Sequence, residues 1–145
     1  MFNQKKQMSM KRLFWILAAV FAVVATPTLS AATPEGSDKS AVLKVTNDNF
    51  DALAGQHKLL IVDFWAPWCP PCRALTPVVE ELATEYVGKV AIGKCNVDEN
   101  KELTRKFEVS SIPAVFFIKN GKIVDSHLGY CEKAVLKEKI EKFRK

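Results

Sequence analysis

Cys69 and Cys72 are the residues of this sequence whose types and spacing point most directly to chemistry. Two cysteines three positions apart at the start of a helix can join their sulfurs in a disulfide. The first lies at the helix N-terminus, where the helix dipole and the free backbone N–H groups stabilise a thiolate. Because the thiolate is the species that attacks disulfides, the pair predicts thiol–disulfide exchange.

Two other uses of such a pair have less support. A purely structural disulfide would close a very short loop, and it would therefore remove little entropy from the unfolded chain. A structural zinc site needs four ligands, usually from two such pairs. The other candidate ligands form no second pair with this spacing: Cys95, Cys131, His57 and His127.

The sequence around the pair predicts a junction between a strand and a helix. Residues 59–65 (LLIVDFW) form a continuous apolar run that only Asp63 interrupts, which is typical of a strand buried on both faces. A helix is predicted from residue 69 to 87, with Gly88 as its stop. Trp65 and Trp68 give the site an apolar rim that excludes water and offers contact area to a polypeptide.

The rest of the chain alternates between strand and helix patterns. Asn120-Gly121 is a strong signal for a two-residue hairpin turn. Strands separated by helices favour parallel pairing through right-handed crossovers. The predicted order is β-α-β-α-β-α-β-β-α, an α/β fold with a mixed central sheet and helices on both faces. The remaining strands are predicted at residues 41–45, 90–97, 114–118 and 122–128, and the remaining helices at 47–54 (ended by Gly55), 100–107 and 132–145.

The N-terminus has the layout of a secretory signal peptide. Four basic residues precede an uninterrupted apolar stretch of 13 residues, and small residues follow it up to Ala32. We expect a signal peptide over residues 1–32, cleaved after Ala32, then a flexible tail over 33–40 and one domain over 41–145. Export would place the domain in the periplasm or another extracytoplasmic compartment, where disulfides persist. An uncleaved leader would tether the domain to the membrane.

Composition narrows the class of partner. The chain has 145 residues, which suits one domain, and a formal net charge of +5. Residues 1–32 carry four basic residues and no acid, so the remainder holds 17 basic and 16 acidic side chains. A nucleic-acid partner would require a basic face on the folded domain, and that balance does not supply one. We expect a monomer that binds no nucleic acid.

The stretch around the cysteines resembles the thioredoxin active site, whose usual form is WCGPC. The resemblance covers about residues 41–144, and the predicted topology agrees with the thioredoxin fold. Its markers come in the expected order along the chain: the acid Asp63, the cysteine pair, Pro77 inside the following helix, Ile112-Pro113 before the hairpin and Gly129 after it. A proline at position 77 should kink its helix.

The resemblance implies roles for four catalytic positions. Cys69 corresponds to the attacking nucleophile and Cys72 to the resolving cysteine. Asp63 corresponds to the buried acid that helps to deprotonate the resolving thiol, and burial should raise its pKa. Lys94 corresponds to a lysine that faces this acid. The alternative for Asp63 is a structural carboxylate with a full set of hydrogen bonds.

The resemblance also implies a substrate-binding set. Pro113 corresponds to a cis-proline that faces the disulfide. A cis bond there would expose the backbone of Ile112, so that a substrate strand could pair with it. Gly129 corresponds to a glycine that lets the partner chain approach closely, and Trp68 and Pro71 complete the set.

The chain departs from the family pattern between the cysteines, where Pro70-Pro71 replaces the usual Gly-Pro. Neither proline has an N–H group, so the thiolate of Cys69 loses a backbone donor and Cys72 N–H becomes its main remaining one. A raised thiol pKa and a stiffer loop would both make the pair more reducing. The histidine that strongly oxidising relatives usually carry is absent, although a proline after the first cysteine also occurs in oxidising relatives.

Two further cysteines lie outside the pair. Cys95 is predicted to be a small buried hydrophobic residue in a strand. Cys131 follows Gly129-Tyr130, and it is interpreted either as a packing residue or as an accessory thiol near the partner.

These observations predict an exported thiol–disulfide oxidoreductase that reduces disulfides in exported proteins, with the Cys69–Cys72 pair as its redox centre and no metal or other cofactor. The resemblance implies a membrane electron-transferring reductase as electron donor. Relatives dedicated to cytochrome c maturation carry a central insertion for which residues 73–95 leave no room. The alternatives are a disulfide oxidase or isomerase on the same site, and a non-catalytic partner-binding module.

Overall fold

A computed structural model describes residues 41–145 of the chain. The signal peptide and the tail predicted for residues 1–40 lie outside the described residues. Every strand and helix predicted from residue 41 onward is present, with ends that differ by up to three residues. The elements are β1 (Leu43–Lys44), α2 (Phe50–Gln56), β2 (Leu59–Trp65), α3 (Pro70–Glu85), β3 (Ala91–Asn96), α4 (Lys101–Lys106), β4 (Ala114–Lys119), β5 (Lys122–Leu128) and α5 (Lys133–Phe143).

The five strands form one mixed sheet in the order β1-β3-β2-β4-β5. Strands β1 and β2 run parallel to β3, whereas β4 is antiparallel to β2 and β5 is antiparallel to β4. The mixed sheet and the antiparallel hairpin confirm the prediction. Asn120 and Gly121 both have positive φ angles, as a two-residue hairpin turn requires.

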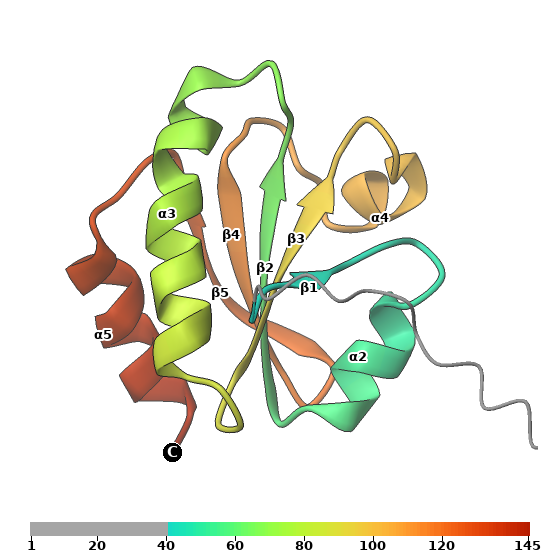
Figure 1. Cartoon of the computed structure of the whole chain (residues 1–145). Coiled ribbons are helices and arrows are strands. Elements are labelled where there is room, and N and C mark those ends of the chain that lie inside the picture. Colours follow the sequence, from blue (N-terminus) through green and yellow to red (C-terminus); the bar gives the residue numbers. More distant parts are fainter. Residues whose placement is uncertain (1–40) are drawn as a thin grey trace, which may run out of the picture. The chain divides into compact units, whose positions relative to one another are not determined.

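The preference for parallel pairing between strands separated by a helix is wrong for β4. Strand β3 ends at Asn96, opposite Trp65, and β4 begins at Ala114, opposite Phe64. The connection through α4 therefore starts and finishes at the same end of the sheet, as Figure 1 shows. Because the chain does not cross over, β4 runs back along β2 in the opposite direction.

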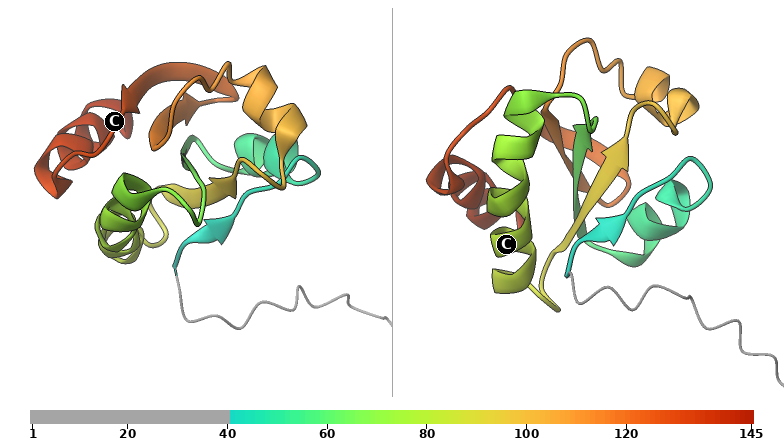
Figure 2. Two further views of the ribbon diagram at one scale, coloured as in Figure 1. Left: turned by 90° about the horizontal axis from the view of Figure 1, so that it is seen from above. Right: turned by 45° about the horizontal axis from the view of Figure 1, so that its top comes forward.

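Helices α3 and α5 cover one face of the sheet, and α2 and α4 cover the other (Figures 1 and 2). Side chains alternate along β2, so that Leu60 and Val62 pack with α2 and α4 while Leu59 and Ile61 lie beneath α3 and α5. The strand is thus buried on both faces, as its continuous apolar sequence predicts. Asp63 has the same parity as Leu59 and Ile61, and it belongs to the α3/α5 face.

Two glycine predictions have different outcomes. Helix α2 continues through Gly55 to Gln56, so the predicted stop at Gly55 is wrong, because that glycine has no positive φ and remains helical. Gly88 has a φ of +75° and follows the end of α3, as predicted for a helix stop. Pro77 lies inside α3, which continues past it to Glu85.

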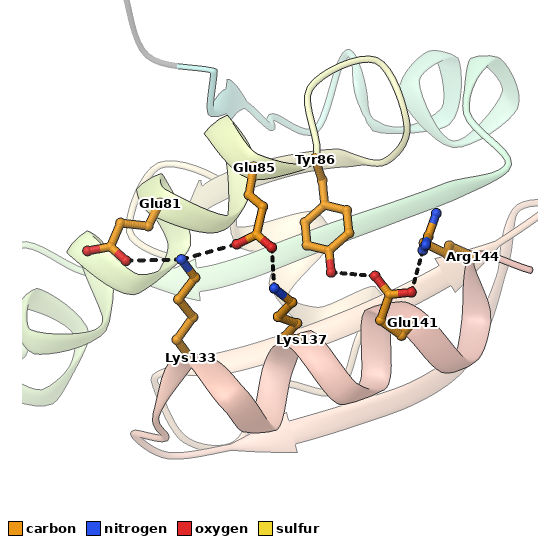
Figure 3. A network of polar contacts seen from close by, with 7 residues as sticks. All are labelled: Glu81, Glu85, Tyr86, Lys133, Lys137, Glu141 and Arg144. Atoms are coloured by element: carbon orange, nitrogen blue, oxygen red, sulfur yellow. Dashed lines mark hydrogen bonds and ion pairs between the residues drawn. The ribbon is translucent and has the colours of Figure 1, made fainter.

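Helices α3 and α5 are joined along their exposed sides by a network of polar contacts (Figure 3). Lysines on the exposed side of α5 pair with glutamates of α3. The hydroxyl group of the buried Tyr86 donates a hydrogen bond to Oε1 of Glu141 at 2.6 Å. The network consists of Glu81, Glu85, Tyr86, Lys133, Lys137, Glu141 and Arg144.

Between residues 41 and 145, no helix has the length and apolar character needed to cross a membrane.

Candidate functional site

Cys69 and Cys72 form a disulfide at the N-terminus of α3, directly after the loop that follows β2. Cys69 is the N-cap residue, and the two Cα atoms are 5.3 Å apart. Pro70 and Pro71 fill the first two helical positions, where a missing N–H leaves no helical hydrogen bond unmade. The pair therefore lies at the strand–helix junction that the sequence predicted.

Two backbone groups lie close to the Sγ atom of Cys69. The N–H of Cys72 donates to it at 3.3 Å, which is the donor that the sequence predicted. The carbonyl oxygen of Ile112 lies 3.8 Å from the same sulfur. Cys69 is only 3% exposed and Cys72 is fully buried. A thiolate at Cys69 would thus face one N–H donor and the positive end of the α3 dipole.

The loop before β4 and the end of β5 meet beside the disulfide. The Ile112–Pro113 peptide bond is cis, as predicted. The N–H of Gly129 donates to the carbonyl oxygen of Pro113 at 2.8 Å, which fixes these two segments to each other. Gly129 has a φ of +84°, a conformation that favours glycine, and the space that a Cβ atom would occupy is open.

Trp68 forms the most exposed apolar part of the site. Its side chain is 65% exposed, and its Nε1–H donates to Oδ2 of Asp98 at 2.8 Å. Leu128 and Tyr130, on either side of Gly129, are also exposed apolar residues. The sequence analysis missed Asp98, Leu128 and Tyr130. The only signal for the last two was their position around the glycine, and Asp98 gave none.

Asp63 is 1% exposed, on the sheet face beneath α3 and α5. Among the described residues, neither carboxylate oxygen has a hydrogen-bond partner. Burial raises the pKa of Asp63 from 3.8 to about 7, against the attraction of Lys94, which lowers it. The raised pKa was predicted, and the alternative of a fully hydrogen-bonded structural carboxylate is not what the structure shows.

Lys94 is the residue opposite Asp63 in the parallel register of β2 and β3. Its Nζ atom donates to Oγ1 of Thr76 at 2.6 Å and lies 4.3 Å from the ring centroid of Trp65. Thr76 in turn donates to the carbonyl oxygen of Cys72 at 3.1 Å. The sequence analysis missed Thr76, and its only signal was a hydroxyl one helical turn after Cys72.

The two remaining cysteines are buried free thiols. Burial raises the pKa of Cys95 to about 12, with smaller contributions from Asp63 and Glu99, and Cys95 is the small buried residue that was predicted. Cys131 packs in the core between the sheet and the α3/α5 layer, and burial raises its pKa as well. Its surroundings favour the packing interpretation over that of an accessory thiol.

Within residues 41–145, no group of three or more histidine, cysteine or acidic side chains is placed to hold a metal ion.

Comparison with known proteins gives a consistent result. The Thioredoxin family model matches residues 41–142. A protein named "Thioredoxin M-type, chloroplastic" from Pisum sativum is 47% identical over 103 residues, which are 70% of this chain but only 60% of that protein. "Thioredoxin" from Staphylococcus saprophyticus is 49% identical over 102 residues, covering 70% of this chain and 97% of that protein.

A solved structure shows the same architecture. A single-residue mutant of thioredoxin from Halobacterium salinarum NRC-1 matches with a TM-score of 0.68 and 30% sequence identity, covering 76% of this chain and 97% of that chain.

Proposed function

Because this chain belongs to the thioredoxin family, we propose that it is an exported thiol–disulfide oxidoreductase that reduces disulfides in extracytoplasmic proteins. The observation that carries the chemistry is the Cys69–Cys72 disulfide at the N-terminus of a 16-residue helix, with Cys72 N–H directed at the outer sulfur. The basic and apolar leader sequence of residues 1–32 supports export.

The first step is attack by the Cys69 thiolate on a substrate disulfide. A new bond forms between Sγ of Cys69 and one substrate sulfur, and the substrate S–S bond breaks. The second substrate sulfur leaves as a thiolate and takes a proton from water. The helix dipole and Cys72 N–H stabilise the attacking thiolate before the reaction.

The second step releases the product. Cys72 loses its thiol proton to the carboxylate of Asp63 and attacks Sγ of Cys69. The Cys69–Cys72 disulfide forms as the Cys69–substrate bond breaks, and the substrate sulfur leaves as a thiolate that takes a proton from water. Two electrons have then passed from the dithiol to the substrate. A pKa of about 7 suits Asp63 to this transfer, because near neutral pH it can both accept a proton and give it up.

Substrate polypeptides would dock on the apolar side chains around the disulfide. Trp68, Leu128 and Tyr130 are exposed, and Ile112 presents its carbonyl oxygen next to Cys69. An extended substrate segment pairing with the Ile112 backbone would bring its disulfide to Sγ of Cys69.

The oxidised pair must be reduced again after each cycle. An extracytoplasmic compartment has no pool of reducing thiols, so we propose that a membrane electron-transferring reductase supplies the electrons by the same exchange chemistry. The protein then needs no cofactor beyond its own cysteine pair.

The reduction potential of the Cys69–Cys72 pair tests the direction of the reaction. The domain of residues 41–145 is equilibrated against a thiol buffer, alkylated and analysed by mass. A reduction potential of about −270 mV supports a reductase, whereas a potential of about −120 mV would make the protein a disulfide-forming enzyme. Export is tested separately, by sequencing the N-terminus of the mature protein, which should begin after Ala32.

A further inference from the structure

Lys94 stands next to Asp63 in the sheet, yet its ammonium group is directed elsewhere. The two residues are partners in the register of β2 and β3. The ammonium group donates to Thr76 at 2.6 Å and lies over the ring of Trp65. The carboxylate of Asp63 is left without a hydrogen-bond partner among residues 41–145.

Thr76 is oriented to accept this hydrogen bond. Its own hydroxyl proton is directed to the carbonyl oxygen of Cys72, one turn earlier in α3, at 3.1 Å. With that proton engaged, the lone pairs of Oγ1 are available to Lys94. The result is a continuous polar connection from β3 through Thr76 to the backbone of the resolving cysteine.

A second threonine of α3 provides an internal comparison. Thr84 donates its hydroxyl to the carbonyl oxygen of Glu80 at 3.0 Å, the same bond to the preceding turn that Thr76 makes. Among the described residues, no lysine donates to Thr84. The bond to the preceding turn is therefore an ordinary property of threonine in a helix, and the contact with Lys94 is what distinguishes Thr76.

We propose that Thr76 is a positioning residue, which holds the Lys94 ammonium group away from Asp63 and so keeps Asp63 basic enough to take the proton of Cys72. The link to Cys72 rests on the proposed function. The electrostatic effect of Thr76 on the proton affinity of Asp63, exerted through Lys94, does not depend on that function.

The physical effect follows from the distance between opposite charges. An opposite charge within about 4–6 Å lowers the pKa of a carboxyl group by about 1–3. A Lys94 ammonium bonded directly to Asp63 would therefore make this carboxylate a weaker base. In the observed arrangement burial has the larger effect, and the pKa of Asp63 stays near 7.

The other ionisable groups around this site do not replace Lys94. Cys95 and Cys131 are influenced by Asp63, but burial raises the pKa of both thiols, so both are neutral at physiological pH. Glu80 of α3 attracts Lys94 electrostatically, which supports its outward orientation. On the other side of β2, Asp63 is paired with Val115 of β4, which is in turn paired with His127 of β5. Val115 therefore separates the histidine from Asp63 in the sheet.

The test is a direct titration of Asp63 in the oxidised protein, by NMR of its carboxyl carbon. Thr76→Val removes the hydroxyl and keeps the branched shape. We expect it to release Lys94 and to increase the acidity of Asp63 about tenfold. Thr84→Val is the matched control and should leave the titration unchanged, and Thr76→Ser, which keeps a hydroxyl, should restore the wild-type value. An unchanged titration in Thr76→Val overturns the proposal.

A Lys94→Met variant shows whether Thr76 acts on the titration of Asp63 through Lys94. In Lys94→Met, the additional Thr76→Val change should no longer shift the titration of Asp63, and a shift that persists there also overturns the proposal. The acid limb of the rate of product release should move to lower pH in Thr76→Val. The titration of Asp63 needs no turnover, so it tests this inference independently of activity. A protein that fails to reduce disulfides contradicts the proposed function only, and the titration still decides the role of Thr76.

Discussion

The backbone N–H of Cys72 donates to Sγ of Cys69 at 3.3 Å, across two residues that have no N–H of their own. In a chain with glycine at position 70, the residue next to Cys69 would carry a second backbone N–H as a candidate donor to the same sulfur. Here Pro70 removes that donor. The stability of the Cys69 thiolate therefore depends on one hydrogen bond and the dipole of α3.

Replacing Pro70 by glycine should make the pair less reducing. The restored N–H stabilises the thiolate of the reduced form, so the pKa of Cys69 should fall and the reduction potential should rise by about 20 mV, equivalent to about 1 kcal/mol. Thiolate absorbance against pH and equilibration with a thiol buffer measure the two quantities. Pro67→Gly, in the loop before the helix, is the control, and an equal effect there would argue against the missing donor.

Cys72→Ser should trap the substrate as a mixed disulfide. Without the resolving thiol, Cys69 can still attack, but no group displaces the substrate from it. Incubation with a disulfide-bonded peptide followed by mass spectrometry should show one peptide per protein. Cys69→Ser should show none, because Cys72 is fully buried. Adducts of equal yield in both variants would contradict the assigned order of attack.

Asp63→Asn should stabilise the protein at alkaline pH and have little effect at acid pH. The folded-state pKa of Asp63 is raised from 3.8 to about 7, so the folded protein binds more protons than the unfolded chain between these values. Stability is thus lost as the pH rises from about 4 through 7, and above 7 the cost of the buried charge is on the order of 2–4 kcal/mol. Urea unfolding at pH 4 and pH 8.5 measures the difference.

The exposed residue Asp51 provides the comparison for that experiment. Asp51→Asn should change the free energy of unfolding by no more than about 0.5 kcal/mol at either pH. A gain from Asp63→Asn that is the same at both pH values would show that the carboxylate is not the source of the effect.

Trp68→Ala should weaken substrate binding without weakening the fold. The indole is 65% exposed, so its removal should change the free energy of unfolding by about 0.5 kcal/mol or less. We expect KM for a disulfide-bonded peptide to rise about tenfold, since exposed aromatic side chains are frequent anchors in interfaces. Val87→Ala, another exposed apolar position, should leave KM unchanged.

Gly93→Ala should destabilise the sheet, whereas Gly55→Ala should not. A Cβ atom at position 93 would lie 2.5 Å from Cγ2 of Val45 and 2.8 Å from the carbonyl oxygen of Leu43, and overpacking of this kind costs about 1–3 kcal/mol. At position 55, inside α2, the same change meets no atom within 4 Å and should add about 0.5–1 kcal/mol of stability. Urea denaturation compares them, and equal effects would be contrary to expectation.

Local sequence determined much of this protein. The length and β-branched content of the apolar run of residues 59–65 favoured a strand with both faces covered, and the structure has that strand. The Asn120-Gly121 turn and the placement of Cys69 and Cys72 at a helix start likewise follow from backbone preferences of a few adjacent residues. A lone acid in a buried strand also predicted the raised pKa of Asp63.

Tertiary structure alone decided which distant groups meet. The antiparallel direction of β4 depends on where α4 returns the chain, and the partner of Trp68 turned out to be Asp98, 30 residues away. Lys94 could have paired with Asp63, its neighbour in the sheet, but it donates to Thr76 because α3 packs over that part of the sheet. Sequence patterns encode the conformation and burial of each segment. The hydrogen-bond partner of a long, flexible side chain depends instead on which acceptors the folded chain brings within its reach.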